Sequence, residues 1–167
     1  MATMSAEFIC SDPTIYGSTL YTVTVEPFLM NMGVPYNVTY NKAYPILKSQ
    51  GATEVENVGK WESWPVLRIY GPHQGSMTNP VIWNYAVGKK MDFSNGSGLT
   101  LTSGQVLVID TYPSRRSITI DGETRYNTLT SASDWIDLAS GMNYFRFDVN
   151  GTDEGVYMTV EYRDAWI

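Results

Sequence analysis

The 167-residue sequence has very few of the side chains that build metal and redox sites. Its single cysteine, Cys10, excludes an internal disulfide and a cluster of thiolate metal ligands. Its single histidine, His73, excludes zinc sites made of several histidines and leaves any catalytic triad only one imidazole. We therefore expect no metal ion and no other cofactor.

Positive charge is also scarce in this sequence. Only 11 lysines and arginines stand against 17 aspartates and glutamates, which gives a formal net charge of −6. Proteins that bind nucleic acid neutralise phosphates with a basic stripe, so this balance argues against nucleic acid as a partner. No apolar run approaches the ~20 residues of a membrane-spanning helix. The beginning, "MATMSAEFIC", lacks the charged and apolar regions of a secretory signal, so we expect neither a signal peptide nor membrane insertion.

Apolar and polar residues alternate along most of the sequence. In "SITID" the apolar positions are Ile118 and Ile120, and in "NYFRFDV" they are Phe145, Phe147 and Val149. The segments "TLYTVTVE" and "VYMTVEYR" alternate in the same way. This period of two predicts half-buried strands, and many short strands with close turns predict an all-β sandwich of two antiparallel sheets.

Two segments depart from simple alternation. The run Val106–Ile109 in "QVLVID" is apolar at every position, which predicts a strand that is covered on both faces, by a second sheet on one face and by a loop or another subunit on the other. The best helical candidate is "SASDWIDLA", where Ser133 could cap a short turn of helix, but the segment is too short to be stable alone.

Turn chemistry and apolar pairing predict two loops. Asp121-Gly122 is a strong signal for a two-residue hairpin, because glycine accepts the positive φ of a type I′ turn. A loop from Asn150 to Gly155 would place Phe147 opposite Met158 and continue the apolar pairing on both sides. We therefore predict a hairpin between these last two long strands.

The sequence divides near residues 71–80, "GPHQGSMTNP", which are rich in glycine and proline. Residues 1–70 are predicted to be an N-terminal arm that contributes strands to the sandwich. Residues 71–167 are predicted to form the sandwich domain itself. The terminal segment "YRDAWI" is expected to lock the C-terminus against the sandwich, with Trp166 and Ile167 as apolar anchors.

The charged residues Asp110, Arg115, Arg116 and Asp121 surround a proline turn and a hairpin. Without a visible base or metal partner, we interpret them as turn residues and solvated charges. The sequence also lacks Walker, dinucleotide-binding, G-x-S-x-G and HExxH motifs, so we expect no enzymatic activity.

Aromatic residues crowd the segment "KWESWPVLRIYGPH" and continue just beyond it. The four candidate binding residues are Trp61, Trp64, Tyr70 and Trp83. They can form core or interface packing, or they can form a platform that stacks on sugar rings. A carbohydrate-binding module for host envelope polysaccharide is accordingly the alternative function.

The order of several motifs resembles the C-terminal domain of siphovirus distal tail proteins, also called the phage tail component family. A strand like "GQVLVIDT" is followed by an R-x-I-T-I-D-G hairpin, then by "DWIDLASGMNYFRF", and the sequence closes on "VEYRDAWI". Earlier, "FICSDPTIYG" and "NVGKWESWPVLRIYGP" resemble the family as well. The resemblance covers nearly the whole chain.

The resemblance implies a galectin-like jelly-roll sandwich and a structural role in the virion. Such proteins lie at the distal end of a long non-contractile tail and form a hexameric ring. The ring joins the tail tube to the tip and receptor-binding proteins. Family members usually carry an N-terminal belt domain that builds the ring, and none is visible before "EFICSDP". We therefore expect either that the sequence is a fragment of a longer protein or that the ring contacts come from elsewhere. The sugar-binding His-x-Asn-Pro-Arg strand of true galectins is missing, since Gln74 and Gly75 follow His73.

Overall fold

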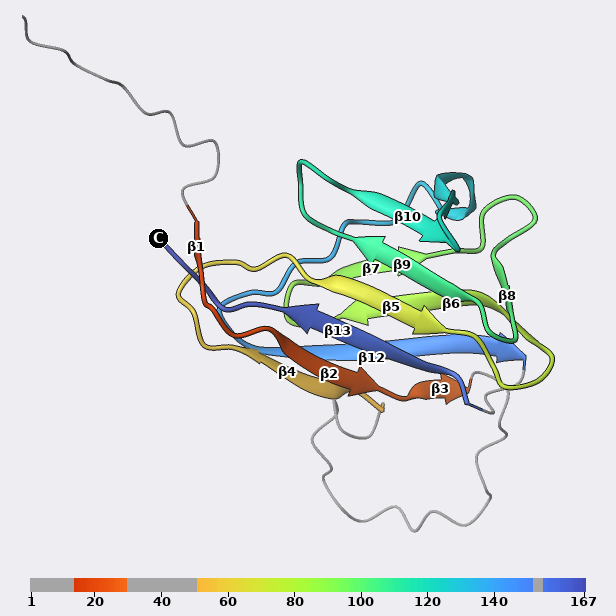
Figure 1. Cartoon of the computed structure of the whole chain (residues 1–167), viewed down its shortest axis with the longest axis horizontal. Coiled ribbons are helices and arrows are strands. Elements are labelled where there is room, and N and C mark those ends of the chain that lie inside the picture. The colour runs from red at the N-terminus through yellow and green to blue at the C-terminus, as the bar shows by residue number, and fades with distance from the viewer. Residues whose placement is uncertain (1–13, 30–50, 152–154) are drawn as a thin grey trace, which may run out of the picture.

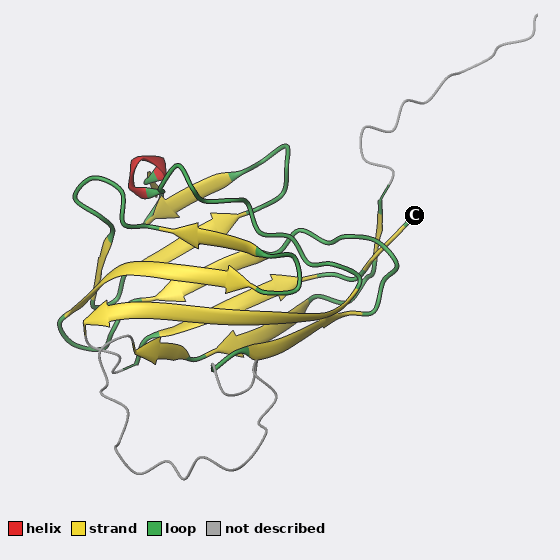
Figure 2. Cartoon of the chain, turned by 180° about the vertical axis from the view of Figure 1, so that it is seen from behind, coloured by secondary structure: helices red, strands yellow, loops and turns green. Residues whose placement is uncertain are grey.

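The computed structural model describes residues 14–29, 51–151 and 155–167. These residues form fourteen strands and one short 3-10 helix, η1 (Tyr126–Thr128). Most of the strands lie in two stacked sheets, which Figure 1 shows from one side and Figure 2 from behind. The predicted all-β sandwich is therefore confirmed. No helix in the described part of the chain is long and apolar enough to cross a membrane.

The first sheet contains six antiparallel strands in the spatial order β11–β10–β9–β5–β13–β2. Their bounds are β2 (Tyr21–Val25), β5 (Val66–Tyr70), β9 (Val106–Asp110), β10 (Ser117–Ile120), β11 (Glu123–Thr124) and β13 (Tyr157–Tyr162). Strand β5 lies between β9 and β13, so strands from both sides of residue 70 share this sheet.

The second sheet has the order β3–β12–β6–β7, and in addition β4 pairs with β12 and β8 pairs with β6. The bounds are β3 (Pro27–Leu29), β4 (Thr53–Asn57), β6 (Ser76–Asn84), β7 (Lys89–Asp92), β8 (Thr100–Thr102) and β12 (Gly141–Gly151). The β3–β12 pair is parallel, which departs from the purely antiparallel sheets predicted. Only Glu26 separates β2 from β3, so the chain crosses between sheets without reversing direction.

The core lies between the two sheets and is made by alternate residues of their strands. Leu67 and Ile69 of β5 are fully buried, as are Phe145 and Phe147 of β12. The inward faces predicted from "SITID", "NYFRFDV" and "VYMTVEYR" are confirmed, because their apolar positions all belong to this one buried cluster. Alternation thus identified the residues that exclude water.

The predicted hairpin between β12 and β13 is wrong. Strand β12 pairs with β3, β4 and β6, whereas β13 pairs with β2 and β5. The two strands belong to different sheets, so Phe147 and Met158 enter the core from opposite layers. Part of the predicted Asn150–Gly155 loop lies outside the described residues. The Asp121-Gly122 hairpin is confirmed, with φ values of 50° and 87° and with Ile120 opposite Glu123.

Two further expectations are corrected by the structure. Residues 131–140 contain no helix, because Ser133 bonds to strand β7 instead of capping a turn: its hydroxyl accepts from the Asp92 N–H at 3.0 Å. Within the chain, β9 is buried on one face only, by Leu107 and Ile109. Val106 and Val108 remain half-exposed on the outer side of the first sheet, so no loop of the described residues covers this face fully, and cover by another subunit stays a prediction.

A network of buried asparagines holds the segment that leads into β12. Asn143 accepts hydrogen bonds from Asn84 Nδ2 and from the Ala139 N–H, both at 3.0 Å. Its own amide donates to the carbonyls of Ala139 and Gly141, at 2.9 and 3.1 Å. Because Asn84 and Asn143 are fully buried, these bonds replace the water that the amide groups lose on folding.

The C-terminal segment closes one end of the sandwich. Strand β14 (Ala165–Trp166) pairs antiparallel with β1 (Ile15–Tyr16), and Figure 1 shows both beside the C-terminus. The predicted lock is present, but its anchors differ from those expected. Ala165 is fully buried, Trp166 is half-buried and Ile167 is 68% exposed. Ile167 is therefore not an apolar anchor.

Candidate interaction surfaces

The four aromatic residues predicted as a binding site lie in four different surroundings. Trp64 and Tyr70 stand near opposite ends of β5, Trp61 precedes them beside the C-terminus, and Trp83 belongs to the second sheet. The structure therefore does not bring them together into one platform. A binding role for any single one of them stays a prediction.

Trp61 belongs to a corner of exposed apolar side chains around the C-terminal strand. The backbone N–H of Trp61 donates to the Ala165 carbonyl at 3.0 Å, and the backbone carbonyl of Trp61 accepts from Asn57 Nδ2 at 2.7 Å. The backbone is thus held while the indole is 45% exposed. Other exposed apolar residues on segments that pair with or adjoin this strand are Ile15, Val58 and Ile167. We call Ile15, Val58, Trp61 and Ile167 the apolar corner.

Trp64 lies in a cluster of aromatic and cationic side chains at the other edge of the sandwich. The Arg116 guanidinium carbon is 6.0 Å from the Trp64 ring centroid and 5.3 Å from that of Trp135. Lys89 Nζ is 5.9 Å from the Trp64 centroid and 2.9 Å from a carboxylate oxygen of Asp137. Cations at these distances are attracted to the ring faces. The sequence-based interpretation of Arg116 as a solvated charge missed this contact.

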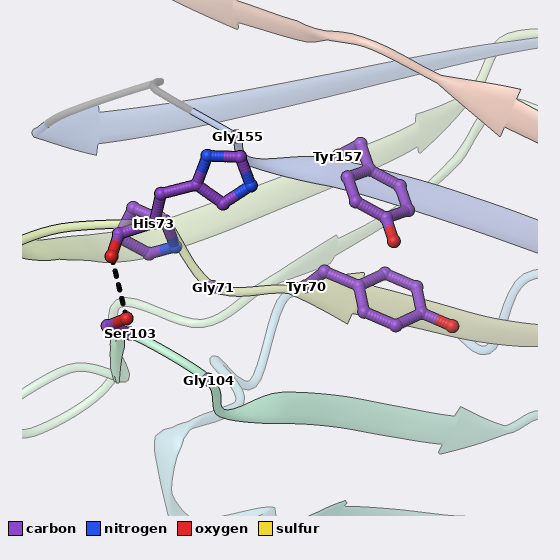
Figure 3. Close-up of a pocket in the computed structure, with 8 residues that line it drawn as sticks. Tyr70, Gly71, His73, Ser103, Gly104, Gly155 and Tyr157 are labelled. Carbon is purple, nitrogen blue, oxygen red and sulfur yellow. Dashed lines mark hydrogen bonds between the residues drawn. The ribbon is translucent and has the colours of Figure 1, made fainter.

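Tyr70 lines a shallow pocket of about 310 Å³ on the outer side of the first sheet. Figure 3 shows its ring beside Tyr157, with a centroid distance of 4.4 Å and nearly parallel planes. Pro72, His73, Ser103 and three glycines complete the wall. The Ser103 hydroxyl donates to the His73 carbonyl at 2.8 Å, so it is bonded to the backbone and not to the imidazole. This arrangement is not a Ser–His pair for nucleophilic catalysis.

Trp83 lies on the outer side of the second sheet, opposite Arg146 of β12. Its ring stacks on Tyr85 at 5.9 Å, and Lys90 Nζ is 5.3 Å from its centroid. Arg146 is held beside Asp148 by a 2.5 Å contact from Nε to the carboxylate. The ring faces of Trp83 are therefore already in contact with side chains of the same chain.

The other charged residues around the proline turn, Asp110, Arg115 and Asp121, have the structural roles that the sequence predicted. The Asp110 carboxylate accepts from the Tyr112 N–H at 3.0 Å, and its second oxygen lies 3.7 Å from Arg115 Nε. Asp121 has the positive φ of a hairpin turn and accepts from Gln105 Nε2 at 3.2 Å. Within the described residues, no three histidine, cysteine, aspartate or glutamate side chains form a group that could hold a metal ion.

The pKa of one ionisable group near the C-terminal strand, the Tyr162 phenol, is shifted by its surroundings. Burial raises the pKa of the Tyr162 phenol above its ordinary value of 10.0, and the nearby Asp164 carboxylate raises it further. The phenol donates to the Glu56 carbonyl at 2.7 Å, and its ring stacks on Tyr21. The group is therefore a neutral hydrogen-bond donor in the folded chain at neutral pH.

Comparison with known proteins identifies the family. Residues 58–166 match the sequence model of the siphovirus-type tail component, C-terminal domain. The chain belongs to this phage tail component family. The family match covers more than half of the sequence and includes the strands β5 to β13 of both sheets. The distal tail family suggested by the motifs is thus confirmed.

A solved structure shows the same fold. The crystal structure of the SPP1 Dit (gp 19.1) protein superposes with a TM-score of 0.63 at 16% sequence identity. That protein is described as a paradigm of the hub adsorption apparatus in phages that infect Gram-positive bacteria. The similarity covers 95% of this chain and 51% of SPP1 Dit, so the chain spans about half the length of that relative. No curated protein matches the chain significantly.

Proposed function

We propose that this tail component is a structural protein at the distal end of a long non-contractile tail, where it joins the tail tube to the tip and receptor-binding proteins. The observation that carries the proposal is the family match over residues 58–166. The similarity to a hub protein of an adsorption apparatus supports the distal position. We further propose that several copies form a ring, as a hexamer by family resemblance.

The surfaces of the sandwich support a role in assembly. The apolar corner exposes large apolar side chains on segments that pair with or adjoin the C-terminal strand, and exposed apolar patches mark contact sites in soluble proteins. The described residues show no catalytic arrangement in the pocket or around the proline turn, and the outer aromatics contact other side chains of the chain. A non-enzymatic binding role is consistent with these surfaces.

Immunogold electron microscopy of phage particles tests this proposal. An antiserum raised against the purified chain should label the end of the tail opposite the capsid. Preimmune serum and particles of an unrelated phage serve as controls. Labelling of the capsid, or labelling along the tail without enrichment at its end, would contradict the proposed position.

A carbohydrate-binding role is the second candidate, and the pocket beside Tyr70 and Tyr157 is the observation that favours it. Tyrosine rings at a shallow pocket can stack on sugar rings, as aromatic residues do in many binding sites. Titration with host wall polysaccharides should change the tyrosine and tryptophan fluorescence of the wild-type chain, and Tyr157→Ala should abolish the change. A flat titration across several polysaccharides would exclude this function.

A further inference from the structure

The sequence contains two asparagine-glycine steps, Asn95-Gly96 and Asn150-Gly151. This dipeptide deamidates readily, because glycine has no side chain that keeps its backbone nitrogen away from the asparagine side chain. The glycine nitrogen bonds to Cγ of the asparagine, the bond from Cγ to Nδ2 breaks, and the Nδ2 group leaves as ammonia with the proton of the glycine N–H. Water then opens the resulting succinimide to aspartate or isoaspartate. The backbone conformation therefore decides which of the two steps reacts.

The Asn95-Gly96 step lies in an exposed turn between β7 and β8 (Figure 1). The Gly98 N–H donates to the Asn95 carbonyl at 2.9 Å, and Gly96 has a φ of 63°, so residues 95–98 form a tight turn. Asn95 and Gly96 are both exposed, and a β-carbon on Gly96 would meet no atom beyond its chain neighbours within 4 Å. Among the described residues, none accepts a hydrogen bond from the Gly96 N–H. The attacking nitrogen is therefore accessible.

A single exposed hydrogen bond holds the side chain of Asn95. Its Nδ2 donates to the Asn127 carbonyl at 2.9 Å, and the backbone N–H of Asn95 donates to the Thr128 carbonyl at 3.0 Å. Water can replace the side-chain bond at little cost, because both of its groups are exposed, and the amide can then rotate toward Gly96. The two bonds tie the turn to η1. Deamidation exchanges the Nδ2 donor for a carboxylate oxygen, which cannot donate to the Asn127 carbonyl.

The Asn150-Gly151 step is held in a strand. The two residues lie at the end of β12, opposite Thr78 and Met77 of β6, and Asn150 is half-buried. In an extended strand the side chain points away from the following backbone nitrogen. The Gly151 nitrogen can therefore reach the Asn150 side chain only after the pairing of β12 with β6 opens locally. This step is an internal control with the same dipeptide chemistry.

We propose that Asn95 deamidates spontaneously in the folded protein and that the product releases the β7–β8 turn from η1. Water is the only co-reactant, and each event adds one carboxylate to a chain that already carries a formal net charge of −6. The released segment is joined to another turn, because the Tyr126 hydroxyl of η1 donates to the Arg116 carbonyl between β9 and β10. The inference does not depend on the proposed function.

Peptide mapping by mass spectrometry tests the site. The purified full chain is incubated at mildly alkaline pH, once folded and once unfolded in urea, and aspartate and isoaspartate are quantified at both steps over time. In the folded chain Asn95 should convert at least about tenfold faster than Asn150, because the strand must open first. In urea the two rates should become similar. Equal rates in the folded chain, or conversion of Asn95 only in urea, would overturn the proposal.

Three variants test the consequence for η1. Asn95→Asp, which mimics the product, should speed amide hydrogen exchange at Thr128 and Leu129 by about threefold or more, because one hydrogen bond to η1 is lost. Asn127→Asp is the matched control, since it adds the same charge beside the same bond and keeps the Nδ2 donor of Asn95. Asn95→Gln retains an amide and should convert far more slowly than the wild type, since its cyclisation closes a larger ring. Unchanged exchange in Asn95→Asp would refute the release of the turn from η1.

Discussion

The backbone of Gly59 lies directly against the backbone of Ala165. A β-carbon placed on Gly59 would stand 2.0 Å from the Ala165 carbonyl oxygen and 2.5 Å from its nitrogen. The flanking residues hold the same contact, since the Val58 N–H donates to the Asp164 carboxylate at 3.0 Å. The C-terminal strand is thus attached to the turn after β4 through main-chain contacts that leave no space for a side chain.

Gly59→Ala should destabilise the fold by about 3 kcal/mol, because backbone atoms cannot move aside as a flexible side chain can. Urea unfolding followed by tryptophan fluorescence measures this change. Gly17→Ala is the matched control, since its β-carbon would meet the Trp166 ring at 3.2 Å and the Asp164 carbonyl oxygen at an ordinary contact distance of 3.6 Å. Similar losses of unfolding free energy for both variants would show that the backbone contact of Gly59 with Ala165 does not set the cost of the substitution.

Trp166→Ala should cost about 1 to 2 kcal/mol of unfolding free energy, because the indole is half-buried and not part of the core. Ile167→Ala should change stability by less than about 0.5 kcal/mol, as expected for an exposed side chain. Chemical denaturation of the two variants beside the wild type measures both values. A large loss for Ile167→Ala would place that side chain in a buried contact.

Asn143→Leu should destabilise the chain by about 3 kcal/mol. The substitution removes the acceptor for Asn84 Nδ2 and for the Ala139 N–H, and buried donors without partners cost about 1 to 3 kcal/mol each. Asn127→Leu at an exposed position is the control. Thermal unfolding followed by circular dichroism measures the melting temperatures of the two variants. Equal melting temperatures would show that the hydrogen bonds of Asn143 do not stabilise the fold.

Stability should depend on Tyr162 at high pH. The folded state raises the pKa of this phenol above 10.0, so its contribution is fully present below about pH 10. The contribution is lost as the pH rises from 10 through the folded pKa, because the unfolded chain releases the proton first. Tyr162→Phe should cost about 1 kcal/mol at pH 7 by removing the bond to Glu56, and should flatten the alkaline decline. An unchanged decline between pH 10 and 11.5 would assign it to other groups.

The buried faces of the strands could be predicted from the sequence because alternation has a local cause. Ile118 and Phe147 face inward for the same reason, since successive side chains of a strand point to opposite sides. The choice of neighbouring strand has no such local cause. The apolar pattern of β12 fits any partner strand with the same period of two. The pattern therefore predicts Phe147 opposite Met158, although the two side chains enter the core from opposite sheets.

The candidate sites were harder to predict because their contacts join distant parts of the chain. The aromatic residues Trp61, Trp64 and Tyr70 are close in sequence, but the direction of β5 and the contact with Ala165 separate their surroundings. The stacking of Arg116 on Trp135 depends on how residues 125–140 cross the sandwich edge. No local pattern in "YPSRRS" indicates that crossing.

A cryo-electron microscopy map of isolated tails tests the central claim most directly. The account predicts several copies of this two-layer sandwich around the tail axis, at the end opposite the capsid. A map that resolves the distal end and contains no such sandwich, or that places it only in the capsid, would contradict the account.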